Sequence, residues 1–377
     1  MLSRIKSFVC RHRRKFVTTG AVIGGCMLLL KWTQYKLREM QERQAKEISE
    51  KLKRMQHFEC TERTCNQTIA GIAPALSEKI FQLLDTDSLL VKLRSNPGDK
   101  LMLWEDIKIV AFTRLVTLVY AASMLGVTMK VQLNLLGGYL YKNTVEVDDQ
   151  QKQQISENIQ KAYLSMIQHF MGDGIEKLID IVRKNVTTVM QRYSLKQQLT
   201  LADAEALLWS FQMALNNEEE SPTKCIARYT LPPASAGEDS VFKKLFDETL
   251  DVLESVESSD VLLANVSNGF SLIVDKLADY YVKAEKISDA PAENSKSLLN
   301  VESLSNINNI KISLAKLIPI VSGLACKMMP SNGGLASNGL TMSEPGDADM
   351  MSWLIIRFLQ SEKLRTLGAN VYETFCQ

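Results

Sequence analysis

The chain has 377 residues, with 44 basic and 43 acidic side chains and a formal net charge of +1. Hydrophobic residues make up 46% of the chain, which is enough to form a sizeable core. Near-neutral charge gives no reason to expect nucleic acid as a partner. No segment recurs at a fixed period, which excludes a repeat architecture.

The first predicted element is a membrane anchor. Residues 16–30 carry no charge and follow a head with six basic side chains, Arg4, Lys6, Arg11, Arg13, Arg14 and Lys15. The uncharged run gives a helix of about 22 Å, somewhat short of a hydrocarbon core of about 30 Å. Lys31 can snorkel and Trp32 suits the interfacial zone. We therefore expect a basic segment over 1–15 and a transmembrane helix over 16–32; a cleaved secretory signal is disfavoured because no small-x-small cleavage site follows.

Composition leaves the orientation of the anchor open. Six basic residues before the span would keep the N-terminus in the cytosol under the positive-inside rule. The seven cysteines are scattered and odd in number, which is typical of reduced cytosolic thiols and places the remainder of the chain in the cytosol instead. These two indications oppose each other.

The remainder of the chain reads as helical. Residues 33–57 are good helix formers, and opposite charges lie four residues apart at Arg38 and Glu42 and at Glu39 and Arg43, so we expect a charged juxtamembrane helix. Over residues 58–377 apolar side chains recur at helical spacing, and two-residue alternation is nearly absent. This pattern predicts an all-α fold of at least seven helices and no sheet, arranged as a single elongated helical bundle behind the N-terminal transmembrane helix.

The most apolar part of this bundle is residues 101–141. It has no charge between Arg114 and Lys130, so a second membrane span is one possible interpretation. Polar side chains such as Thr117 and Gln132 are unfavourable on a lipid-facing helix. A central helix covered by others on every side is therefore the favoured interpretation.

The sequence shows no catalytic or metal-binding pattern. The three histidines have no metal-ligand or triad spacing, and Cys60-x4-Cys65 has no second pair to complete a zinc site. Gly172-Asp173-Gly174 and Gly137-Gly138 lack the rest of a phosphate-binding loop and read as helix ends or close backbone contacts. We expect no catalytic residue, metal, cofactor or small-molecule substrate, and an interaction protein in place of an enzyme.

Seven strings along the chain, in order and spacing, resemble the peroxin-3 family. They are Arg63-Thr64-Cys65-Asn66-x-Thr68, Trp104-Glu105-Asp106-Ile107-Lys108-Ile109, Phe112-Thr113-Arg114, Val131-Gln132-Leu133-Asn134-Leu135-Leu136-Gly137-Gly138-Tyr139, Ile167-Gln168-His169 with Gly172-Asp173-Gly174, Leu314-Ala315-Lys316-Leu317-Ile318-Pro319-Ile320-Val321, and Asn370-Val371-Tyr372-Glu373. Residues 216–300 and 330–347 match this family poorly.

The resemblance implies an all-helical cytosolic domain held in the peroxisomal membrane by one N-terminal helix, with the short N-terminus in the matrix. It implies a docking receptor for peroxin-19, the soluble chaperone of newly made peroxisomal membrane proteins, supporting their insertion and peroxisome biogenesis. The expected partners are the amphipathic N-terminal helix of peroxin-19 and peroxisomal membrane lipid.

The resemblance also carries the docking role onto particular residues, with Trp104 as the central contact and Leu93, Lys100, Ile107 and Lys316 around it. Spacing agrees with this assignment, because Lys100, Trp104, Ile107 and Lys108 fall on one helix face just after a break at 96–98. The alternative is that Trp104 is an ordinary core aromatic.

A second function class is a membrane-tethered helical module that binds or transfers lipid. In that case residues 101–141 would line a cavity instead of filling a core. This alternative predicts a hollow of several hundred Å3, the usual size of a small-molecule site.

Overall fold

The computed structural model describes residues 13–95, 98–145, 155–233, 240–288, 309–325 and 349–376, and side chains within them except at 13–17, 19–23 and 283–288. The chain divides into two compact units, Met1–Glu59 and Cys60–Gln377. The elements are α2 (Arg13–Leu83), α3 (Asp87–Arg94), α4 (Lys100–Val145), α5 (Glu157–Ser165), α6 (Ile167–His169), the π-helix η1 (Phe170–Gly174), α7 (Ile175–Met190), β1 (Gln198–Leu199), α8 (Leu201–Asn217), α9 (Ile226–Thr230), α10 (Ser240–Leu253), α11 (Val256–Ser288), β2 (Ile312–Ser313), α12 (Leu314–Ala325), α13 (Met350–Leu359) and α14 (Glu362–Phe375).

The predicted all-α fold class is confirmed, with one small correction. Strands β1 and β2 form a two-residue antiparallel ladder, in which Gln198 pairs with Ser313 and Leu199 with Ile312. The expectation of no sheet was wrong here, because a strand of two residues is too short to show an alternating pattern.

Helix α2 runs without interruption through the predicted anchor and the charged segment that follows it. Two of the predicted pairs form: Arg43 contacts Glu39 at 2.6 Å and Arg38 contacts Glu42 at 3.4 Å. Every described side chain from residue 24 to residue 38 is exposed. The helical conformation of this segment is therefore established, and its insertion in a membrane stays a prediction.

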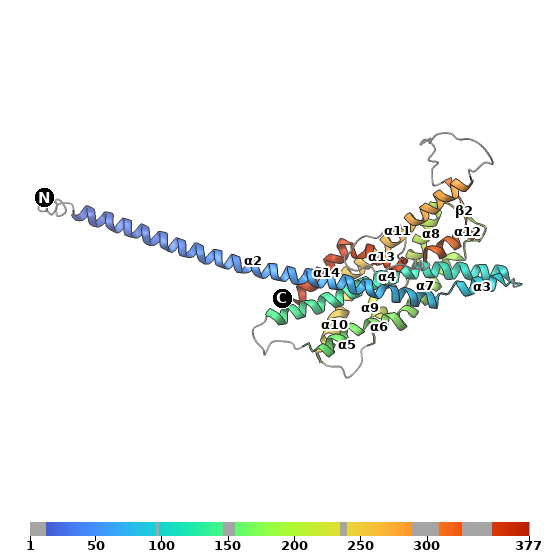
Figure 1. Ribbon diagram of the computed structural model, residues 1–377, viewed down its shortest axis with the longest axis horizontal. Coiled ribbons are helices and arrows are strands. Elements are labelled where there is room, and N and C mark those ends of the chain that lie inside the picture. Colours follow the sequence, from blue (N-terminus) through green and yellow to red (C-terminus); the bar gives the residue numbers. More distant parts are fainter. Residues whose placement is uncertain are drawn as a thin grey trace, which may run out of the picture. The chain divides into compact units, whose positions relative to one another are not determined.

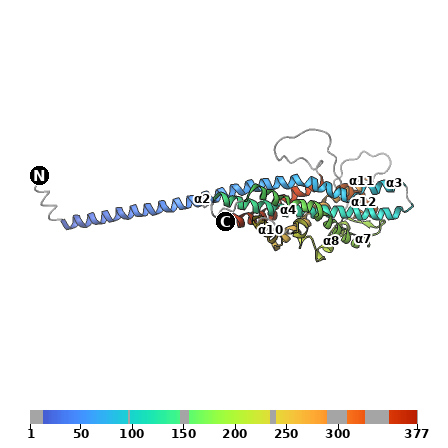
Figure 2. The ribbon, with the colours of Figure 1, turned by 90° about the horizontal axis from the view of Figure 1, so that it is seen from below.

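Helix α4 is the core of the unit Cys60–Gln377. From Ala111 to Gln132 every side chain is buried. Helices α7, α11, α12, α13 and α14 all pack against α4, which runs between them in both ribbon views (Figures 1 and 2). Among the described residues, α4 and α11 are long and apolar enough to cross a membrane, but 89% of the most apolar window of α4 is buried inside the fold. The structure thus supports a central core helix in place of a second span.

One buried ion pair joins α4 to α2. Lys130 is fully buried and its ammonium contacts the carboxylate of Glu62, which is also buried. The amide of Asn134 donates to the Lys130 carbonyl oxygen at 2.9 Å, one turn along. Gly368 of α14 leaves room for this group, since a Cβ there would lie 2.8 Å from the Asn134 amide nitrogen. Because neither charge of a buried pair can be left alone without a large cost, the pair fixes the register of α2 on α4.

The π-helix η1 shows why one of its glycines is needed. Gly174 packs against the backbone of α9, and a Cβ there would lie 1.9 Å from the carbonyl oxygen of Tyr229. Gly172 lies two residues away in the same element, and a Cβ there would meet no atom within 4 Å. The close backbone contact expected for this glycine pair is therefore a property of Gly174 alone.

We expect Gly174→Ala to lower the free energy of unfolding by about 2–3 kcal/mol, because the clash is with backbone and cannot be relieved by rotating a side chain. Gly172→Ala is the matched control. It should leave the free energy of unfolding unchanged or raise it by up to about 1 kcal/mol through helix propensity. Urea denaturation of the full chain in nonionic detergent, followed by circular dichroism, measures both. Equal effects of the two substitutions would contradict the packing argument.

Candidate functional site

Helix α3 is a short element with an outward-facing surface. None of its residues is buried, although Leu89, Leu90 and Leu93 pack partly against the core. The carboxylate of Asp85 accepts hydrogen bonds from the backbone N–H groups of Asp87 at 2.8 Å and Ser88 at 3.2 Å. These bonds satisfy donors that the helix itself cannot satisfy, so they fix the point at which α3 begins.

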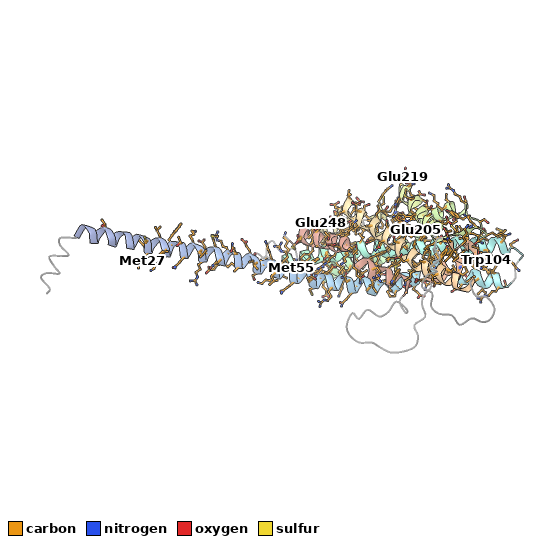
Figure 3. All side chains as sticks on the ribbon, turned by 90° about the horizontal axis from the view of Figure 1, so that it is seen from above. Met27, Met55, Trp104, Glu205, Glu219 and Glu248 are labelled. Atoms are coloured by element: carbon orange, nitrogen blue, oxygen red, sulfur yellow. The ribbon has the colours of Figure 1, made fainter. Side chains whose placement is uncertain are left out.

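Apolar side chains are exposed where α3 faces the start of α4. Val91 is 63% exposed, Leu101 70% and Met102 68%. Leu93 and Trp104, on the same two helix segments, are half-buried. We name this set, Val91, Leu93, Leu101, Met102 and Trp104, the α3–α4 surface. Trp104 lies near the end of the unit at which α4 begins (Figure 3).

Trp104 is neither fully exposed nor sealed in the core. Part of its indole packs against the core and part reaches solvent. Of the predicted face formed by Lys100, Trp104, Ile107 and Lys108, the last two residues do not reach the surface, because each is only 2% exposed. The ammonium of Lys108 donates to the carbonyl oxygens of Met190 at 3.3 Å and Tyr193 at 3.0 Å. Ile107 is therefore buried in the core one turn beyond Trp104 and does not form part of the α3–α4 surface.

The two lysines expected at the site, Lys100 and Lys316, lie on different helices, and only Lys100 is on the same helix as Trp104. Lys100 is exposed in the first turn of α4, one turn before Trp104. Lys316 is exposed on α12, and the backbone of the preceding Ala315 donates to the carbonyl oxygen of Leu195 at 3.0 Å. The segment that includes Leu195 also holds Tyr193, which binds Lys108. The helix that carries Lys316 is thus hydrogen-bonded to the segment that binds Lys108.

A set of polar contacts holds α12 against the helices of the site. The guanidinium of Arg114 donates to the Ser322 hydroxyl at 2.8 Å and to its carbonyl oxygen at 3.2 Å. The Ser322 hydroxyl also lies 3.5 Å from that of Thr86, the residue before α3, and the Arg114 guanidinium stacks 4.9 Å from the Phe81 ring. These contacts join α2, α4 and α12 directly beneath α3.

Sequence reasoning missed three residues of this surface, Val91, Leu101 and Met102. The available signal was two consecutive apolar residues, Leu101 and Met102, in the first turn of a helix. The first turn of a helix at the end of a bundle has fewer neighbouring helices than its middle, so apolar residues there can remain exposed to solvent. The resemblance drew attention to Trp104 and left these neighbours aside.

Other chemistry in the described residues is sparse. No group of three or more His, Cys, Asp or Glu side chains there could hold a metal ion. Burial raises the pKa of the Cys65 thiol to about 12, so that thiol stays protonated, and the five described cysteines are not paired in disulfides. Two cavities of about 490 and 520 Å3 are lined by residues of other segments, with none from 101–141.

Fold and surface together define an all-helical protein with a partly exposed tryptophan among exposed aliphatic side chains. The peroxin-3 family model matches residues 7–99 and 95–374. Peroxisomal biogenesis factor 3 of Homo sapiens is 33% identical over 398 residues, and that of Mus musculus 32% over 395, each alignment covering 100% of this chain and 98% of the relative. Peroxisome biogenesis protein 3-2 of Arabidopsis thaliana is 23% identical, over 85% of this chain and 95% of that protein.

The chain belongs to the peroxin-3 family. Membership assigns it to peroxisome biogenesis and to the peroxisomal membrane. The family is one of biogenesis factors and is not a known family of enzymes.

We expect Asp85→Ala to weaken the start of α3, because two backbone donors lose their acceptor. At about 1 kcal/mol for a lost cap, protection of the α3 amides from hydrogen exchange should fall about fivefold. Asp87→Ala, an exposed acid in the same turn, is the control and should change protection much less. Mass-spectrometric exchange on peptides that cover residues 84–95 measures the difference; equal loss in both variants would contradict the capping role.

The same contact gives a pH dependence with a defined sign. Hydrogen bonds from Ser88, first its hydroxyl and then its N–H, lower the pKa of Asp85 in the folded chain. The stabilisation is therefore present above the unfolded pKa of about 3.9 and is lost as pH falls through the lower folded value.

Proposed function

We propose that this chain is a docking receptor in the peroxisomal membrane, and that its α3–α4 surface captures the amphipathic N-terminal helix of peroxin-19. Membership in the peroxin-3 family supports the cellular setting, and the resemblance described above supplies the chaperone as partner. On this proposal the receptor brings newly made membrane proteins to the bilayer without any catalytic step.

The single observation that carries the proposal is the exposure of Val91, Leu101 and Met102 on the two helix ends, one of which also carries the half-buried Trp104. Soluble surfaces seldom collect apolar side chains without a partner to cover them. A half-buried tryptophan with exposed aliphatic neighbours gives a bound helix one large contact and a ring of smaller ones. That is the usual composition of an interface in which few residues carry most of the binding free energy.

An amphipathic helix suits this surface in shape and in charge. The apolar face of such a helix presents side chains at i, i+4 and i+7, which can cover a surface built from two helix ends. Lys92, Arg94 and Lys100 are exposed at its border and can pair with carboxylates of the partner. Asp99, next to Lys100, and Asp106, in the second turn of α4, are exposed too, so these pairs would act at short range and would add less than the apolar contacts.

The anchor is the second part of the proposal. Met27, Leu28, Leu29 and Leu30 are exposed on α2 and have no covering element among the described residues. Lipid would cover them, and Trp32 and Tyr35 would lie at the interface. We propose that the basic N-terminus lies in the matrix and the unit Cys60–Gln377 in the cytosol, as in the family. Five described cysteines without disulfides accord with a reducing compartment.

The lipid-transfer alternative finds less support. It requires a hollow along residues 101–141, whereas side chains of this segment fill the core and line neither described cavity.

We expect Trp104→Ala to weaken binding of a peroxin-19 N-terminal peptide about 30-fold, which corresponds to a loss of about 2 kcal/mol at a central aromatic contact. Isothermal titration calorimetry on the full chain in nonionic detergent measures this. Trp353→Ala is the matched control, because Trp353 is also half-buried but lies on α13. A folded Trp104→Ala variant with unchanged affinity would refute the site.

Ile107 provides a second discrimination within the same helix. Because its side chain is buried, Ile107→Ala should lower the free energy of unfolding by about 2 kcal/mol or more and affect peptide affinity less than Trp104→Ala does.

The proposed topology is tested by protease protection on intact peroxisomes with one tag at each end of the chain. We expect the N-terminal tag to survive and the C-terminal tag to be degraded, since only the latter would face the cytosol. Detergent should abolish protection of the N-terminal tag. Survival of the C-terminal tag in intact organelles would overturn the orientation.

A further inference from the structure

Helix α8 has an outer face that is unusually apolar for a surface helix. Its exposed positions include Ala202, Ala206, Trp209 and Met213, with Glu205 among them. Trp209 is 40% exposed and Met213 57%, and they lie one turn apart. We name these five residues the α8 face. A surface helix normally places polar side chains on this side, so the α8 face is not explained by folding.

The opposite side of α8 shows that the helix is firmly held. Leu207, Leu208 and Phe211 are buried in the core. Thr200 and Asp203 form a reciprocal capping box at its start, with the Asp203 N–H to Thr200 hydroxyl distance at 3.1 Å and the Thr200 N–H to Asp203 carboxylate distance at 2.9 Å. The amide of Gln212 donates to the Ser267 hydroxyl of α11 at 2.8 Å. The α8 face is thus a fixed surface that needs no ordering before it binds.

The tryptophans of the unit Cys60–Gln377 make the exposure of Trp209 informative. Trp104 and Trp353 are half-buried, so Trp209 is more exposed than either. The Trp353 ring has a cation over it, with the Lys276 ammonium 5.5 Å from its centroid. Ala206 lies one turn before Trp209 and is too small to cover the exposed part of the indole. Tryptophan in that position is among the residues that most often dominate binding interfaces.

Around the α8 face carboxylates outnumber cations, of which Lys184, Arg228 and Lys311 act on Glu218, Glu220 and Asp203. Residues 197–223 contain no Lys or Arg and hold five carboxylates, Asp203, Glu205, Glu218, Glu219 and Glu220. The neighbouring helix α11, over residues 256–282, carries four carboxylates and the single cation of Lys276, which covers Trp353. A partner with basic side chains would therefore be attracted to this side of the fold, and an anionic bilayer would be repelled.

Two of these carboxylates are available to a partner. Asp203 is used in the capping box, Glu218 contacts Lys184 at 2.9 Å, and Glu220 contacts Arg228 at 2.6 Å. In the described residues no cation pairs with Glu205 or Glu219, and both are exposed. Glu219 lies at the outer edge of the unit in the view of Figure 3.

We infer that the α8 face is a second docking surface, and that its occupant is a basic amphipathic helix of another protein. Trp209 and Met213 contact the apolar side of that helix, while Glu205 and Glu219 pair with Lys or Arg at its border. Glu205 to Asn217 spans about 18 Å of helix, so a partner segment of about three turns would cover the face. This occupant has the opposite charge to an acidic helix at the α3–α4 surface, which lets one receptor discriminate between two kinds of ligand.

The experiment uses the full chain in phosphatidylcholine nanodiscs and a fluorescent Leu/Lys amphipathic peptide of about 18 residues, with a Leu/Glu peptide of the same pattern as its match. Every variant sits in the same nanodisc, so adsorption of the peptide to lipid cancels between variants. Fluorescence anisotropy should show at least a tenfold weaker Kd for Trp209→Ala and an unchanged Kd for Trp104→Ala. Glu205→Lys should weaken binding and flatten its salt dependence, and the Leu/Glu peptide should show no response to any substitution on the α8 face.

Met213→Asp is a second, independent variant should Trp209→Ala disturb folding, which circular dichroism would reveal. Unchanged affinity in folded Trp209→Ala or Met213→Asp protein would overturn the inference, as would equal binding of the Leu/Glu peptide at this face. Mass photometry tests whether a second copy of the chain covers the α8 face instead. If the wild-type chain forms dimers and Trp209→Ala makes them dissociate, the face binds a second copy and the inference is overturned. Peroxin-19 peptide binding, measured in the same nanodiscs, reports separately on the α3–α4 surface.

Discussion

A long helix without a polar face has to be covered on every side, and this constraint organises the unit Cys60–Gln377. From Ala111 to Gln132 no residue of α4 reaches solvent, so the helices that enclose it must each present an apolar side to it. Burial at about 25 cal/mol per Å2 makes this enclosure the main stabilising contribution. The remaining elements are positioned by what they contribute to that cover.

The same constraint explains where a binding surface can form. Burial of α4 on every side begins only at Ala111, and Leu101 and Met102 in its first turn are exposed. Apolar residues that would be interior elsewhere are left in contact with water there, next to a short helix with no buried residue of its own. The α3–α4 surface is therefore an end of the core that other helices do not fully cover. The α8 face, in contrast, is the outer side of a helix whose inner side is fully packed.

Much of the fold could be predicted from the sequence because its signals are long. The charge-free run between Arg114 and Lys130 with scattered hydroxyl side chains indicated a buried central helix, and the charged pairs Arg38/Glu42 and Glu39/Arg43 indicated a solvated one. The two-residue ladder and the π-helix could not be predicted, because each depends on contacts between segments far apart in the chain. The site was predictable only in part. Trp104 and Leu93 came from the resemblance. The burial of Ile107 and the exposure of Val91 could not be predicted, because they depend on which neighbouring helices cover each turn.

The ladder between β1 and β2 has a consequence for how this fold can vary among relatives. Its pairs Gln198–Ser313 and Leu199–Ile312, with the bonds from Leu314 and Ala315 to Gln197 and Leu195, set the starting position of α12 from the α7–α8 side. The start of α12 is therefore held by main-chain bonds to residues 195–199, whichever side chains those residues carry. Because these bonds join main-chain atoms, side-chain substitutions among the paired residues are compatible with an unchanged position of Lys316 and Ser322.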